Sequence, residues 1–185
     1  MDKTALLSYL EKLDAALETP ATLCVYGGAA LILLDEPGRT SVDIDVAAPY
    51  SRASFPDLER AAAAAGLPVN PMEETAGDHI EWIQPIRLCL APPQQGKEIV
   101  LWRGSKLTII TVPIPDLVAS KLIRYDEIDQ ADLAYLLAHH PMAWAPIEDA
   151  IRRLPPPFDS DPVIRDNMGK HRVDIEMRKG LHDSA

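Results

Sequence analysis

The feature that most constrains this chain is a pair of glycines placed directly after an apolar run. Val25 and Tyr26 are followed by Gly27 and Gly28, and a second apolar segment begins at Ala29. Because glycine has no Cβ, the backbone can turn tightly there and come close to phosphate oxygens. The pattern predicts a strand that ends at the glycines and a helix beyond them, whose first N–H groups favour an anion.

Two carboxylates follow at alternate positions of a second predicted strand. Asp43 and Asp45 lie 15 and 17 positions beyond Gly28, and valine or isoleucine flanks each of them. Side chains on a strand alternate between its two faces, so both aspartates project from the same face. Mg²⁺ prefers oxygen ligands and is commonly held by one or two carboxylates together with substrate phosphates. We therefore expect Asp43 and Asp45 to bind Mg²⁺, or Mn²⁺, together with a nucleotide.

The order of these motifs resembles a known fold. The glycine pair, then Arg39, then Asp43 and Asp45 is similar to the nucleotidyltransferase fold of the DNA polymerase beta superfamily. Within that superfamily, the chain resembles small bacterial proteins related to abortive-infection toxins and minimal nucleotidyltransferases. A second segment, 115–133, is similar to the helical part that follows the catalytic sheet there, in which a lysine, an arginine and spaced acids recur. The resemblance spans roughly residues 20–140, about one domain.

The resemblance implies a reaction in which a hydroxyl attacks the α-phosphate of a nucleoside triphosphate and pyrophosphate leaves. Positioning and charge neutralisation supply most of that catalysis. It also implies a nucleotide site in which Gly27 and Gly28 approach the triphosphate and Arg39 shapes the adjoining loop. Lys121 and Arg124 would supply positive charge to the β- and γ-phosphates.

Active members of the superfamily usually add a third carboxylate, commonly an aspartate on a later strand. It helps to hold a second metal ion and to activate the attacking hydroxyl. No aspartate stands at an obvious position for this role, and the best placed candidate is Glu98, followed by Glu81. The expected catalytic set is therefore Asp43, Asp45 and Glu98.

Two functions follow from these assignments. The first is a metal-dependent nucleotidyltransferase that moves a nucleoside monophosphate from a nucleoside triphosphate to RNA, a protein or a small molecule, as in a toxin-like component. The second is a catalytically impaired member of the same fold that binds a nucleotide or a partner protein. The acid that faces Asp43 and Asp45 distinguishes the two functions.

Lys121 and Arg124 have a second interpretation that is purely structural. They are three positions apart on a predicted helix, and Asp116, Asp129 and Asp132 lie near them in the sequence. Ion pairs between neighbouring helical turns are common and contribute only about 0.2–0.5 kcal/mol when exposed. Both interpretations are open at this point.

The fold expected from the pattern is α+β, with a nucleotidyltransferase-like mixed β-sheet flanked by helices and a helical extension at the C-terminus. The chain has 185 residues and 47% apolar content, enough for one substantial core. Residues 1–140 are expected to form the nucleotidyltransferase-like domain, including an amphipathic N-terminal helix. Residues 141–185 are expected to form the helical extension and a polar tail.

Charge and composition limit the classes of binding partner that we expect for this chain. The formal net charge of −10 disfavours a broad surface for nucleic acid. Cys24 and Cys89 lack metal-ligand spacing and suit reduced thiols in a cytoplasmic protein. No apolar stretch reaches the length of a membrane span and no N-terminal signal precedes one, so no membrane partner is expected. The expected partners are a nucleoside triphosphate, an unknown acceptor, and either another protein or a second copy of the chain.

Overall fold

A computed structural model describes residues 1–72 and 77–182, and within the last helix it describes side chains only up to residue 173. The fold is α+β, as expected, with a five-stranded mixed sheet and seven α-helices in the described residues. The chain divides into two compact units. One comprises Met1–Leu88 and Pro92–Pro113, and the other comprises Cys89–Ala91 and Ile114–Ala185.

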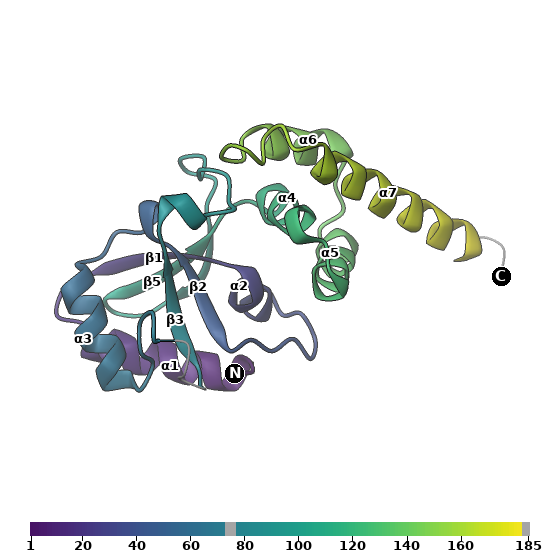
Figure 1. The fold of residues 1–185 in the computed structure, drawn as a ribbon. Coiled ribbons are helices and arrows are strands. Elements are labelled where there is room, and N and C mark those ends of the chain that lie inside the picture. The colour runs from purple at the N-terminus through teal and green to yellow at the C-terminus, as the bar shows by residue number, and fades with distance from the viewer. Residues whose placement is uncertain (73–76, 183–185) are drawn as a thin grey trace. The chain divides into compact units, whose positions relative to one another are not determined.

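The first unit contains the sheet and three α-helices (Figure 1). The strands are arranged in the order β3-β2-β1-β5-β4. β1 pairs antiparallel with β2 and parallel with β5, while β2 pairs parallel with β3 and β5 pairs antiparallel with β4. In chain order the elements are α1 (Lys3–Ala16), β1 (Ala21–Tyr26), α2 (Gly27–Leu33), β2 (Asp43–Ala47), α3 (Phe55–Ala65), β3 (His79–Ile83), β4 (Ile99–Arg103) and β5 (Leu107–Thr111).

The two faces of the sheet differ in polarity. Val25 is opposite Val46, and Ile44 is opposite Ile80, and all four side chains are buried. The other face carries the half-buried aspartates of β2. The expected alternation along β2 is therefore confirmed, and it separates a core face from a polar face.

Helices α1 and α3 pack against each other below the sheet in Figure 1. The leucine stripe expected on the N-terminal helix is buried, with Leu6, Leu10 and Leu13 at most 1% exposed. On α3, small buried alanines allow close packing, and Gly66 ends the helix in the left-handed conformation. This helix begins at Phe55, and Pro56 occupies its first turn.

The apolar segment 86–90 forms no strand in the described part of the chain. The segment 86–90 reads as apolar, but Pro85–Arg87 forms a short 3₁₀ turn and Leu88, Leu90 and Ala91 are buried in irregular backbone. Proline lacks the N–H that a strand interior needs, so the prolines around this segment interrupt sheet pairing.

The second unit is helical. It contains α4 (Ile114–Arg124), α5 (Glu127–His139), α6 (Trp144–Arg152) and α7 (Pro162–His182), and α4 contacts the other three. The segment 114–140, which we expected to belong to the first domain, therefore groups with the C-terminal helices. The polar segment from Gly169 continues α7 as far as His182, and residues 183–185 lie outside the described part. Among the described residues, no helix has the length and apolar character required to span a membrane.

Asp14 joins α1 to the turn between β4 and β5. Its carboxylate accepts hydrogen bonds from the backbone N–H groups of Ser105, Lys106 and Leu107 and from the Ser105 hydroxyl, at 2.6–3.0 Å. A Cβ at Gly104 would lie 2.4 Å from the Asp14 Cγ, so only glycine fits beside the carboxylate. Partial burial raises the pKa of Asp14, but the hydrogen bonds from Leu107, Ser105 and Lys106 outweigh it and lower the pKa to about 2.

We expect Asp14→Ala to lower the free energy of unfolding by about 2–3 kcal/mol, because three backbone donors lose their acceptor. Glu11→Gln, an exposed change on the same helix, is the control and should have little effect. Because the pKa of Asp14 falls from its ordinary value of 3.8 to about 2 on folding, its contribution is complete above about pH 5 and is lost as the pH falls toward 2. Urea unfolding at several pH values should show the gap between wild type and variant closing on acidification; a gap independent of pH would contradict this account.

Candidate functional site

The glycine turn and the second aspartate of β2 lie in direct contact. Gly27 has φ +64°, and a Cβ placed on it would lie 2.2 Å from the Asp45 Oδ2. The pairing of β1 with β2 produces this approach, because Tyr26 is the Cα partner of Asp45. Gly27 is therefore required both for its backbone conformation and for the space that the Asp45 carboxylate occupies.

Gly28 provides a second close approach, to the loop that precedes β2. A Cβ on Gly28 would lie 2.8 Å from the Ser41 Oγ and 3.0 Å from an Arg39 guanidinium nitrogen. The Ser41 hydroxyl donates a 2.6 Å hydrogen bond to the Asp43 Oδ1. The two glycines thus allow both aspartates, and the loop that carries Arg39, to pack closely around the start of α2.

A third carboxylate lies beside Asp45, and it belongs to Glu81. Parallel pairing of β2 with β3 makes Glu81 the Cα partner of Asp45 and His79 the Cα partner of Asp43. Paired residues on neighbouring strands project from the same face, so three carboxylates and one imidazole share the polar face of the sheet. The Glu81 carboxylate lies 3.7 Å from His79 Nε2 and 3.6 Å from an Arg87 guanidinium nitrogen.

Glu98, the residue favoured from the sequence, is located elsewhere on the sheet. It precedes β4, which is separated from β2 by β5 and β1. With neighbouring strands about 4.8 Å apart, its backbone lies roughly 14 Å from that of Asp45. Burial, and secondarily the negative charge of Glu98, raise the pKa of Cys24 to about 12. Glu98 is therefore close enough to influence Cys24 on β1, and Glu81 is the acid next to the aspartates.

The donor set suits a hard divalent cation. Asp43, Asp45 and Glu81 offer carboxylate oxygens, which Mg²⁺ and Mn²⁺ prefer. Within residues 1–72 and 77–173, no three His, Cys, Asp or Glu side chains are already gathered closely enough to hold a metal ion by themselves.

Lys121 and Arg124 form ion pairs within the second unit. The Lys121 ammonium is 3.1 Å from Asp129 Oδ1 and 2.5 Å from Asp132 Oδ2, and all three side chains are at most 8% exposed. Arg124 pairs with Asp126 and Asp129 at 2.8 and 2.9 Å, and its bonds to Asp129 raise its pKa. Asp116 pairs instead with Arg153 at 2.7 Å. The structural interpretation of the lysine and the arginine is thus the one that these contacts support.

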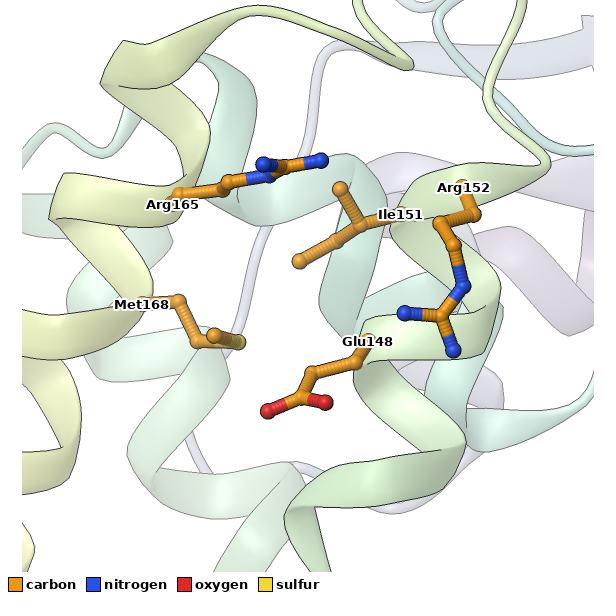
Figure 2. Close-up of a pocket in the computed structure, with 5 residues that line it drawn as sticks. All are labelled: Glu148, Ile151, Arg152, Arg165 and Met168. Carbon is orange, nitrogen blue, oxygen red and sulfur yellow. The ribbon is translucent and has the colours of Figure 1, made fainter.

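Two of the surface clefts in the described residues bear on these assignments. One, of about 290 Å³, lies between α6 and α7 and is lined by Glu148, Ile151, Arg152, Arg165 and Met168 (Figure 2). None of the residues expected in the nucleotide site lines it. The other, of about 330 Å³, lies between the start of α1 and the loop 35–40 and includes Arg39 in its wall.

The sequence interpretation did not include Ser41 or His79 in the site, and it ranked Glu81 behind Glu98. Ser41 stands two residues before Asp43, at a spacing that allows a hydroxyl to reach back to a carboxylate. His79 and Glu81 alternate as Asp43 and Asp45 do, so the same period-two pattern was available to identify them. The pattern does not indicate which strand pairs with β2.

Gly27→Ala should be more destabilising than the same change at another glycine of positive φ. Gly38 has φ +71° and no atom within 4 Å of an added Cβ, so Gly38→Ala isolates the conformational cost, about 1–2 kcal/mol. Gly27→Ala adds displacement of the Asp45 carboxylate to that cost. Thermal unfolding of both variants checks this. Equal losses of stability would mean that the contact with Asp45 is not required.

Lys121→Met should lower the free energy of unfolding by about 3–5 kcal/mol, because it removes the ammonium that lies between buried Asp129 and Asp132 and leaves Arg124 as the cation beside Asp129. Lys170→Met is the matched control: Lys170 is 60% exposed and pairs with exposed Asp166, so it should have an effect below about 1 kcal/mol. Chemical unfolding measures both. A stable Lys121→Met variant that had lost nucleotide binding would instead return Lys121 to the nucleotide site.

Comparison with known proteins does not assign the chain to a family. Models of protein families, curated proteins and solved structures were each compared with the chain, and no match was found.

Proposed function

We propose that this protein is a metal-dependent nucleotidyltransferase that transfers a nucleoside monophosphate from a nucleoside triphosphate to an acceptor hydroxyl. The observation that carries the proposal is the meeting of Asp43 and Asp45, on one face of β2, with the glycine turn that ends β1. Backbone without side chains lies there beside two carboxylates. This is the combination that a triphosphate and its divalent cation require.

Asp43 and Asp45 would hold Mg²⁺ or Mn²⁺, which, when bound, neutralises the charge that develops on the transferred phosphoryl group. Gly27 and Gly28 let the turn pack directly against Asp45 and Ser41, so that the backbone that would approach the triphosphate lies beside the metal-binding carboxylates. Arg39, whose guanidinium lies against Gly28 and also pairs with Glu36 at 3.9 Å, shapes the loop at the same turn.

We assign the third carboxylate to Glu81 in place of Glu98. It lies on the strand next to Asp45, on the same face, where it can accept a proton from the acceptor hydroxyl or complete the metal site. Lys121 and Arg124 are left out of the nucleotide site, because their charges are already matched by aspartates.

The second candidate is a protein of this fold that binds a nucleotide or a partner without catalysis. It is favoured by the contacts of Glu81, whose carboxylate already faces His79 and Arg87. Binding without any turnover would support this candidate.

The proposal predicts magnesium-dependent binding of at least one of the four common ribonucleoside triphosphates. Calorimetric titration with Mg²⁺, and again with a chelator, should give binding only with the metal, and the Asp43→Asn, Asp45→Asn double variant should lose it. No binding of any of the four by the wild type would refute the proposal.

Glu81→Gln and Glu98→Gln form a matched pair for the third carboxylate. Both changes remove one charge from the same face of the sheet. We expect Glu81→Gln to retain nucleotide binding but to reduce pyrophosphate release by at least about 100-fold, the scale of a lost proton acceptor, and Glu98→Gln to have little effect. The reverse result would return the role to Glu98.

A further inference from the structure

Ser41 occupies an unusual place in this site. Its hydroxyl donates to Asp43 Oδ1 at 2.6 Å in a partly buried setting. The same oxygen sits where the side chain of residue 28 would be if that residue were not glycine, 2.8 Å from the ideal Cβ position. The absence of a side chain at Gly28 therefore gives the Ser41 hydroxyl the space from which it reaches Asp43.

The hydrogen bond from Ser41 restricts the rotation of the Asp43 carboxylate. It engages one oxygen of the Asp43 carboxylate, and within the described residues no hydrogen bond is made to the other oxygen, Oδ2. A carboxylate free to rotate would lose conformational entropy on binding a cation, whereas one held by a neighbouring hydroxyl has already lost it. Groups that orient a metal-binding carboxylate typically change metal affinity 10–100-fold when removed.

We propose that Ser41 is a positioning residue of the nucleotide site: its hydroxyl, seated over Gly28, holds Asp43 in the orientation that binds the divalent cation of a metal–nucleotide complex. This inference rests on the proposed function and deepens it. It explains the glycine at position 28 by the space that the Ser41 hydroxyl needs next to Asp43. Ser41 contacts neither nucleotide nor acceptor in this role.

The test measures binding and requires no acceptor. Free Mn²⁺ is counted by electron paramagnetic resonance during titration of the protein with Mn²⁺ alone, and with Mn²⁺ plus each of the four ribonucleoside triphosphates. Ser41→Ala should weaken Mn²⁺–nucleotide binding 10–100-fold without changing the melting temperature appreciably. Ser41→Thr, which keeps the hydroxyl, should bind nearly as well as wild type. Thr40→Ala, which removes the neighbouring hydroxyl, is the control and should leave binding unchanged.

A double-mutant cycle that combines Gly28→Ala with Ser41→Ala tests whether the effect of Gly28 depends on the Ser41 hydroxyl. An alanine methyl at position 28 would displace the Ser41 hydroxyl, so Gly28→Ala alone should weaken binding. In the Ser41→Ala background, part of that loss should disappear because the hydroxyl is already gone. Additive losses would overturn the link between Gly28 and Ser41.

The outcomes separate this inference from the function on which it rests. If the wild type binds no metal–nucleotide complex, the nucleotidyltransferase proposal and this inference fall together. If the wild type binds and Ser41→Ala binds equally well, only the positioning role is refuted. Loss of binding in Ser41→Thr as well as in Ser41→Ala would show that shape, rather than the hydroxyl, matters at position 41, and would also refute it.

Discussion

The contact between the Asp45 carboxylate and the backbone of Gly27 is the constraint on which the polar face of this protein depends. It can form only if residue 27 lacks a Cβ, if its φ is positive, and if β1 and β2 pair in the observed register. Those three conditions specify where β1 ends, where α2 begins and which face of β2 carries both aspartates. A register shift by one residue would turn Asp43 and Asp45 into the core and Ile44 out of it.

Sequence reasoning succeeded where the determinants are local. The glycine turn and the alternation of Asp43 and Asp45 depend on residues within one strand or one turn, so they can be read from composition and period. It failed where strand pairing decides. Glu81 lies within β3 and Glu98 directly precedes β4. The residues around them do not indicate that β3, rather than β4, pairs with β2. The grouping of α4 and α5 with the C-terminal helices likewise depends on long-range packing.

Lys121 illustrates a different limit. A lysine and an arginine three residues apart suit a phosphate site and an ion-pair cluster equally well, and sequence spacing is the same for both. Burial separates them: an ammonium that is 8% exposed and lies between two carboxylates has its charge satisfied inside the protein. Breaking such a pair costs more than a surface pair contributes, which explains why one substitution there is expected to affect a whole helical unit.

The parallel pairing of β2 with β3 gives the polar face two contributions that are far apart in the sequence. Residues 21–47 contain β1, α2 and β2 in one continuous stretch, whereas β3 follows α3 in the sequence. Contacts between residues far apart in the chain form slowly, because a long loop must close first. Formation of the contact between Glu81 and Asp45 therefore requires closure of the segment that contains α3, whereas the contact between Gly27 and Asp45 requires closure only of the shorter segment that contains α2.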